Sequence, residues 1–215
     1  MQKLRIGILM GGKSLEKEVS FNSGRTICDY LDTTLYNAVP LYQREAKLYL
    51  LPWYFLHRGK TTDFECRLDL EAELIAWDDL KNYIDFMYIA QHGRYAEDGT
   101  LQGFLEILHI PYFGSGILPS ALRADKNIHK ILLQDSGIVV PKYITVEPFE
   151  IDNFEQYKES IIQKLQEKEI QFPCIIKPYN EGSSLGISIA NQENLLQSLV
   201  FAYSIERGRK KLMLL

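Results

Sequence analysis

The first 120 or so residues alternate short apolar runs with amphipathic stretches, the pattern of strands and helices that follow one another in turn. Residues 4–10 form an apolar run that closes on two glycines and predicts a buried strand, and residues 84–90 predict a second one. Apolar positions recur at helical spacing over residues 16–32 and 101–108, so each of these stretches predicts a helix with one buried face. A short strand is expected at 112–113. Because strands alternate with helices, we expect an open parallel sheet in an α/β domain.

Two segments inside this region are less regular. Residues 36–57 carry alternating apolar and aromatic residues with two prolines, and they predict a strand followed by a hairpin or an irregular excursion. Residues 58–82 are charged and mixed, which predicts an exposed insertion.

Beyond about residue 120 the pattern changes. A helix marked by Ile128, Ile131 and Leu132 is expected to end at Gly137. Further strands are expected at residues 143–146, 174–177 and 187–189, and further helices at 154–165 and 195–203. The glycine-rich segment 182–186 joins two of these strands, so the second region is expected to be α+β with a strand–loop–strand hairpin at its centre.

Composition narrows the class of protein. Apolar residues make up 46% and charged residues 24% of the 215 residues, which excludes global disorder and a collagen-like repeat. A net charge of −4 and a pI near 5.6 offer no basic face to a nucleic acid. Three distant cysteines and four histidines without metal-ligand spacing indicate a reducing compartment and no metal site. Neither a signal peptide nor an apolar run of ~20 residues is present, so we expect a cytoplasmic protein with no membrane partner.

Residues 7–14 match the phosphate-loop pattern G-x-x-x-x-G-K-S. In a working loop the first glycine stands at the end of the strand, so that backbone N–H groups curl around a phosphate. Here Gly7 falls in the middle of an apolar run, and Glu16 and Glu18 would repel a triphosphate. We therefore do not expect a nucleotide here, and a phosphate-loop NTPase is kept only as an alternative.

Glu16 opens a predicted helix directly after a Gly-Gly turn, at the edge where open α/β sheets bind ligands. A carboxylate at this place can hold an ammonium group. On the residues alone the better explanation is a first-turn glutamate that the helix dipole favours, and the same explanation serves for Glu18.

His92 begins a glycine-punctuated loop after the second buried strand, and the loop also carries Arg94, Glu97 and Asp98. His92 can hydrogen-bond a substrate carboxylate or carry a proton, with Glu97 to orient it. The alternative is that Asp98 caps the next helix and Glu97 is a surface charge.

Lys177 ends a predicted buried strand, and the glycine-rich loop follows within six residues. A lysine there can point at phosphate oxygens, to which the N–H groups of the loop and the hydroxyls of Ser183 and Ser184 can also donate. An ordinary hairpin with a surface lysine is equally compatible with the pattern. Lys126, at a helix start, is a second candidate cation.

Four segments, in order along the chain, together resemble the D-alanine–D-alanine ligases, a family with the ATP-grasp fold. They are Gly11–Ser20 continued by Asn22-Ser23-Gly24; His92–Gly103, similar to H-G-x-x-G-E-D-G-x-x-Q-G; Pro111–Gly116 followed by Asp125-Lys126; and Lys177-Pro178 with Glu181–Gly186.

The resemblance implies three parts. Residues 1–121 would be an N-terminal substrate-binding α/β domain of the pre-ATP-grasp type, residues 122–208 an ATP-grasp central subdomain with a glycine-rich phosphate loop, and residues 209–215 the first strand of a further domain. It also implies the ATP-dependent ligation of two D-alanines for peptidoglycan synthesis, through an acyl phosphate and with release of ADP and phosphate.

The same resemblance implies the site residues. Glu16 would hold the ammonium of the first D-alanine, Ser183 would belong to the hydrogen-bonded set around it, and His92 would lie near the substrate carboxylates. The implied catalytic residues are Glu16, Ser183 and His92; the implied substrate contacts are Glu16, Val19, His92 and Glu97; the implied ATP contacts are Lys126, Lys177, Glu181, Gly182, Ser183 and Ser184.

The sequence departs from the family pattern in two places, and each departure leads to an expectation. Ala96 replaces a common glycine, which adds strain only if that position needs a positive φ. In the family, the part after the position of Leu215 supplies an adenine-binding hinge, a catalytic arginine and the Mg²⁺ ligands, so the 215 residues alone are expected to be inactive. The family's N-terminal domain contributes to a homodimer, which leaves a non-catalytic binding or dimerisation fragment as the alternative to a ligase.

Overall fold

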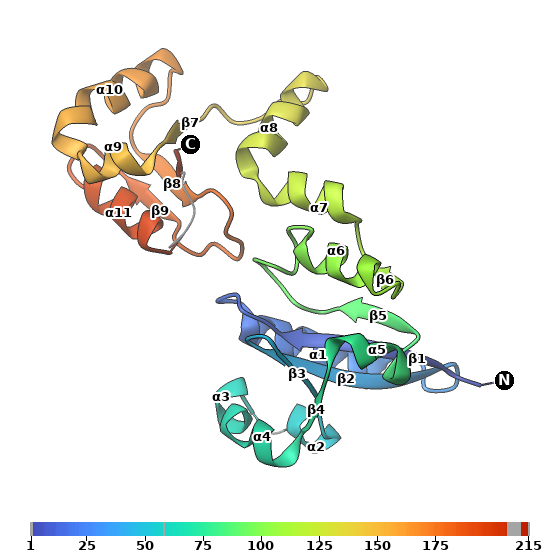
Figure 1. The fold of residues 1–215 in the computed structure, drawn as a ribbon. Helices are drawn as coiled ribbons and strands as arrows, with labels where there is room; N and C mark the ends of the chain where they lie inside the picture. The colour runs from blue at the N-terminus through green and yellow to red at the C-terminus, as the bar shows by residue number, and fades with distance from the viewer. Residues whose placement is uncertain (1, 58, 206–211, 215) are drawn as a thin grey trace. The chain divides into compact units, whose positions relative to one another are not determined.

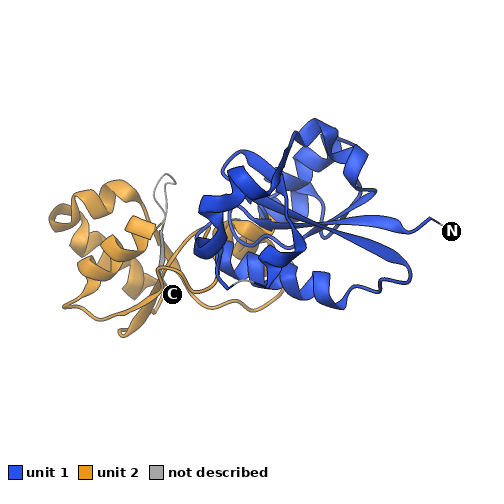
Figure 2. Cartoon of the chain, turned by 90° about the horizontal axis from the view of Figure 1, so that it is seen from below, with its two compact units in different colours: residues 1–121 blue, residues 122–215 orange. Residues whose placement is uncertain are grey.

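The computed structural model describes residues 2–57, 59–205 and 212–214 (Figure 1). The chain divides into two compact units, residues 1–121 and residues 122–215, which Figure 2 draws in different colours. The helix α7 (Ile117–Ala124) runs across the boundary between them.

The first unit is built on a six-stranded sheet in the order β4-β3-β2-β1-β5-β6. Its strands are β1 (Leu4–Gly11), β2 (Tyr36–Arg44), β3 (Lys47–Leu50), β4 (Glu73–Ile75), β5 (Phe86–Ile89) and β6 (Tyr112–Phe113). Strands β2, β1, β5 and β6 are parallel to their neighbours in that order, whereas β2, β3 and β4 pair antiparallel. The expected parallel sheet is therefore confirmed, and residues 36–50 form the hairpin that the sequence allowed.

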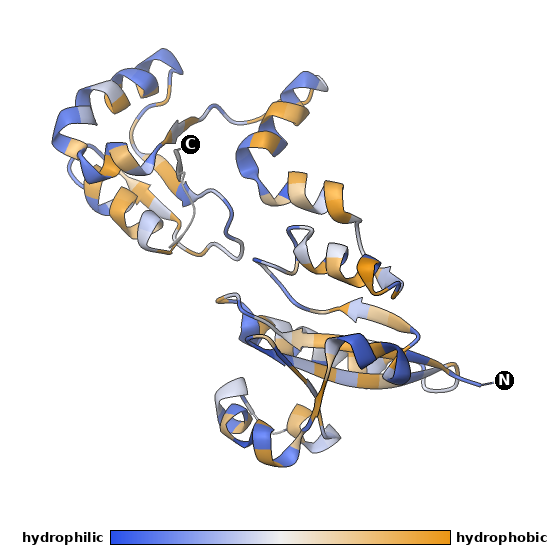
Figure 3. Cartoon of the chain, in the orientation of Figure 1, coloured by the Kyte–Doolittle hydropathy of each residue, from blue (hydrophilic) through white to orange (hydrophobic). Residues whose placement is uncertain are grey.

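Strand β1 is buried on both faces, and its residues alternate between two cores. Met10 packs with Phe21 of α1 (Lys17–Tyr30) on one face, and Leu9 packs with Leu105 of α6 (Thr100–Ile107) on the other. Figure 3 shows the resulting hydrophobic stretches along the strands of this sheet. This double burial explains why β1 reads as a continuous apolar run.

Residues 59–82 do not form the exposed insertion that the sequence predicted. They fold into short elements against the sheet: α3 (Thr61–Phe64), η1 (Glu65–Arg67), α4 (Leu68–Glu71), β4, η2 (Trp77–Asp79) and α5 (Leu80–Tyr83), after α2 (Trp53–Leu56). Phe64 is fully buried, stacked on Phe55 and edge-on to Tyr42. The elements are too short to display a helical period, so composition alone misled the prediction.

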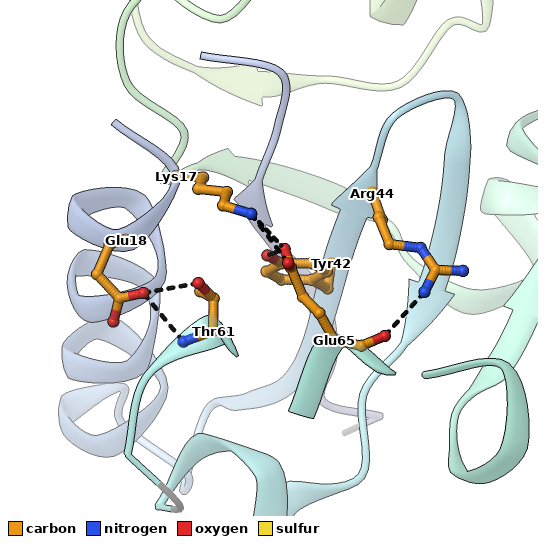
Figure 4. Close-up of polar contacts among 6 residues, drawn as sticks. All are labelled: Lys17, Glu18, Tyr42, Arg44, Thr61 and Glu65. Carbon is orange, nitrogen blue, oxygen red and sulfur yellow. Dashed lines mark hydrogen bonds and ion pairs between the residues drawn. The ribbon is translucent and has the colours of Figure 1, made fainter. Parts of the chain in front are cut away.

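Polar contacts between α1, β2 and this segment fix its position (Figure 4). The Glu18 carboxylate accepts hydrogen bonds from the backbone N–H and the hydroxyl of Thr61, at 2.9 and 2.7 Å. The Glu65 carboxylate accepts from Lys17 Nζ and from the hydroxyl of Tyr42. Burial and the Glu65 carboxylate together raise the pKa of Tyr42. Glu18 therefore has a structural partner beyond the dipole of its own helix.

The second unit contains an antiparallel sheet in the order β7-β10-β8-β9. Its elements are α8 (Lys126–Asp135), β7 (Ile144–Val146), α9 (Pro148–Asp152), α10 (Phe154–Glu167), β8 (Cys174–Pro178), β9 (Ser188–Ala190), α11 (Leu195–Ile205) and β10 (Leu212–Leu214). One core lies between the sheet and α9, α10 and α11, with Ile144, Ile176 and Leu199 among its buried members. The other sheet face carries the alternate residues of each strand.

The segment 209–215 was expected to be the first strand of a further domain. Its described residues, 212–214, lie instead in the sheet of the second unit. Residues 212–214 form β10, which pairs with Ile144–Val146 of β7 and Ile176–Pro178 of β8 inside the second sheet. The expected strand therefore exists, but it completes the sheet of the second unit. Residues 209–211 and 215 lie outside the described residues.

Candidate functional site

The carboxyl ends of β1 and β5 lie side by side because the two strands are parallel neighbours. The loops that follow them, 12–16 and 90–99, therefore meet at one sheet edge. The Ser14 hydroxyl joins the two loops by donating to the backbone carbonyl of His92 at 2.7 Å. The same oxygen accepts the N–H of Glu16 at 3.1 Å.

Glu16 lies at the N-cap position of α1 and is only 5% exposed. One of its carboxylate oxygens lies against the backbone of Gly93, where a Cβ atom would collide with it. Gly93 has a φ of +73°, so two independent constraints require glycine at this position. A buried carboxylate at the N-terminus of a helix and at the ligand edge of the sheet is a suitable acceptor for an ammonium group.

Replacing Gly93 with alanine should lower the free energy of unfolding by about 2 kcal/mol or more, because the methyl group adds a collision with Glu16 to an unfavourable φ. Gly103→Ala on α6 is the matched control, since its Cβ would make only an ordinary contact, at 3.5 Å from Ile117. That control should gain about 0.5–1 kcal/mol. Chemical denaturation measures both, and equal stabilities of the two variants would contradict the close approach of Glu16 to Gly93.

Both the side chain and the backbone carbonyl of His92 make hydrogen bonds. Its Nε2 lies 2.9 Å from the hydroxyl of Ser23 on α1, and its carbonyl accepts the Ser14 hydroxyl. Val19 lies one turn after Glu16 on the same helix and is 48% exposed. The structure thus brings together Glu16, Val19 and His92, three of the residues that the sequence proposed for substrate binding.

Glu97 closes the loop that begins at His92, because its carboxylate accepts the backbone N–H of Gly93 at 2.7 Å. Asp98 accepts the N–H of Thr100, the first residue of α6, at 3.1 Å, although the N-cap position itself is taken by Gly99. Ala96 is not among the described residues with positive φ; Tyr95 takes that conformation instead, with φ of +71°. The alanine therefore adds no strain.

The phosphate-loop alternative fails on the strand register. Gly7 pairs with Val39 of β2 and Met87 of β5, so it lies in the middle of the sheet. Strand β1 continues to Gly11, and no loop remains between Gly7 and Gly12 to surround a phosphate. The ammonium of Lys13 lies over the ring of Tyr95, with 5.7 Å between Nζ and the ring centroid.

The second unit holds a separate cavity of about 160 Å³ at the end of β8. Its lining includes Lys126, Lys177 and the loop from Glu181 to Leu185. Burial lowers the pKa of the Lys177 ammonium. Two lysines facing a glycine-containing loop form a site suited to phosphate oxygens.

The loop has a defined turn conformation. Ser183 and Ser184 both adopt positive φ, at +46° and +60°, and the N–H of Leu185 donates to the carbonyl of Gly182. Lys126 supports the base of the loop, since its Nζ donates to the carbonyl of Glu181 at 2.5 Å and lies 3.3 Å from that of Tyr179. All the residues that the sequence proposed for ATP binding thus belong to one cavity wall or its support.

Among the described residues, no group of three or more His, Cys, Asp or Glu side chains is arranged to hold a metal ion. None of the helices that the structure describes has the length and apolarity that a bilayer crossing requires.

A family model described as the D-ala D-ala ligase N-terminus matches residues 5–115, and one described as the D-ala D-ala ligase C-terminus matches residues 132–207. The chain belongs to the D-alanine–D-alanine ligase family. The first matched range contains Glu16 and His92, and the second contains every lining residue of the Lys177 cavity except Lys126.

Individual members of the ligase family agree with this assignment. A D-alanine–D-alanine ligase of Natranaerobius thermophilus is 35% identical over 213 residues, covering 94% of this chain and 57% of the relative. The solved structure of the ligase from Coxiella burnetii matches 100% of this chain and 61% of its own, at 27% identity and a TM-score of 0.80. The ligase from Bacillus anthracis complexed with ATP matches 98% of this chain and 57% of its own, at 31% identity and a TM-score of 0.66. The chain thus spans less than two thirds of the length of these relatives.

The sequence did not predict the residues that support His92 in this candidate site. No local pattern predicts a contact of Ser14 or Ser23 with His92. Serines carry no signal of their own at such positions; only the pairing of β1 with β5 brings them to the histidine.

Proposed function

We propose that this protein catalyses the ATP-dependent ligation of two D-alanines to D-alanyl-D-alanine, for the synthesis of peptidoglycan precursors in the cytoplasm. A carboxylate oxygen of the first D-alanine attacks the γ-phosphorus of ATP, the bond to the β-phosphate oxygen breaks, and ADP leaves. The amine of the second D-alanine then attacks the acyl carbon, loses a proton, and phosphate leaves with the former carboxylate oxygen.

The cavity at the end of β8 is the observation that carries this proposal. Lys126 and Lys177 face the loop of Gly182, Ser183 and Ser184 there, and cations with oriented donors are what phosphoryl transfer between anions requires. On the adjoining sheet face, the exposed side chains of Ile175 and Ile189 offer an apolar surface for the adenine ring. A relative complexed with ATP supports the same assignment.

In the first unit, we assign the ammonium of the first D-alanine to Glu16, whose carboxylate is buried at the sheet edge. We assign a substrate carboxylate to His92, which Ser14 and Ser23 hold in place. Val19 and Glu97 are proposed as further substrate contacts. Ser183, which lines the cavity of the second unit, is proposed as a contact of the nucleotide phosphates.

The described residues do not supply a Mg²⁺ ligand set, and no step is assigned to the metal. Following the family, we also propose a homodimer through the first unit, which light scattering of the purified chain tests directly.

Phosphate release by the full product of the gene tests the proposed reaction, since the 215 residues alone are expected to be inactive. We expect release that requires both ATP and D-alanine, stays at background with L-alanine, and yields D-alanyl-D-alanine in equal amount. Release without D-alanine would contradict the ligase proposal. ATP binding without any turnover would instead favour the alternative of a non-catalytic binding or dimerisation module.

A further inference from the structure

The second sheet has an open face opposite its helices. Ile144 and Ile176 point into the helical core, so their neighbours Thr145 and Lys177 lie on the other face. Both pair with position 213 of the strand between them, which places them in one row across the sheet. Tyr143, two residues before Thr145, belongs to the same face by the alternation of the strand.

Lys130 of α8 reaches toward this face. Its ammonium lies over the ring of Tyr143, with 4.5 Å from Nζ to the ring centroid. The Nζ atom is buried and has no hydrogen-bond partner among the described residues. Its pKa is lowered to about 8, first by burial and then by the neighbouring charge of Lys177.

A buried ammonium without a hydrogen bond is unfavourable, and a second ammonium nearby makes it more so. The ring of Tyr143 offsets only part of the loss, since a cation–π contact is worth about 0.5–2 kcal/mol. Two neighbouring cations are stable together once an anion lies between them. The arrangement therefore suits a ligand with several negative charges.

We infer that Lys130 is a third cation of the phosphate site and that it binds the polyphosphate chain of ATP together with Lys177. In the free protein its ammonium lies over the ring of Tyr143. This inference rests on the proposed function, because the ligand is the nucleotide that the ligase consumes. It adds a binding residue that lies on α8, outside the glycine-rich loop and its strand.

Titration calorimetry of the 215-residue chain with tripolyphosphate and with ATP tests the inference. Lys130→Met should weaken the binding of both ligands about tenfold or more, since it removes a hydrogen bond between charged groups. Lys177→Met serves as the reference that weakens both, and Lys158→Met, at an exposed position of α10, should change neither. Lys130→Arg should retain part of the affinity that Lys130→Met loses, because it keeps the positive charge.

The melting temperature without ligand is a second measurement, and it shows whether a variant that binds weakly is still folded. Lys130→Met should raise the melting temperature, by about 2–4 °C, because it replaces a buried charge with an apolar side chain of similar length. A less stable variant that binds weakly would point to a packing role and would overturn the inference.

The remaining outcomes separate this inference from the proposed function. Unchanged tripolyphosphate affinity in Lys130→Met, beside a clear loss in Lys177→Met, overturns the role of Lys130 and leaves the ligase proposal intact. Binding of tripolyphosphate that depends on Lys130, without any binding of ATP, supports the cation site and contradicts the nucleotide. If the wild-type chain binds neither ligand, the phosphate site and the role of Lys130 in it are overturned, whereas the ligase proposal is decided separately by the phosphate-release assay.

Discussion

Replacing Phe64 with alanine is expected to lower the free energy of unfolding by about 3–5 kcal/mol. Phe64 is fully buried in the first unit, where its ring stacks on Phe55 and meets Tyr42 and Phe21. Removing it leaves a cavity at the junction of α1, β2 and the segment 59–82, whose other walls are themselves aromatic and cannot collapse into the space. Urea denaturation followed by circular dichroism measures the loss.

Leu70→Ala is the matched control in the same segment, because Leu70 is 85% exposed. Its effect should stay within about 0.5 kcal/mol. If Phe64→Ala behaved like Leu70→Ala, residues 59–82 would after all be the solvated insertion that their composition suggests. The pair of variants therefore decides between the sequence-based expectation and the packing.

Replacing Glu16 with glutamine should reduce kcat/KM for D-alanine about 100-fold in the protein expressed from its own gene. The substitution keeps the size of a side chain that is almost completely buried, and it removes the charge that would pair with the substrate ammonium. Loss of one partner from such a desolvated pair costs about 2–5 kcal/mol. Affinity for ATP should be unchanged, because the phosphate cavity is lined by residues of the second unit.

Glu18→Gln provides the comparison for this effect, since Glu18 lies two residues further along the same helix and its carboxylate binds Thr61. We expect Glu18→Gln to lower stability by about 1 kcal/mol and to leave the dependence on D-alanine as in the wild type. An equal loss of kcat/KM in both variants would assign the effect to α1 as a whole and would contradict a specific role for Glu16.

The sequence predicted the site at Lys177 more directly than the site at Glu16. The glycine-rich loop and Lys177 form a local pattern, because the lysine, the loop and the returning strand follow one another within about fifteen residues. Glu16 was harder to assess, since a helix dipole explains a first-turn glutamate on its own. Its burial against Gly93 is what favours a binding role, and that contact joins residues far apart in the chain.

The chain's local patterns were sufficient for the helices α1, α6 and α10, for the strands β1, β5 and β8, and for the glycine-containing loops after these three strands. Each of these elements is set by the burial period or the backbone freedom of consecutive residues. Tertiary structure alone decided the rest: the burial of Phe64, the serines at His92, the place of residues 212–214 between β7 and β8, and the approach of Lys130 to the face that carries Lys177. The physical reason is that these contacts depend on the order of strands in a sheet, which no local period of apolar residues specifies.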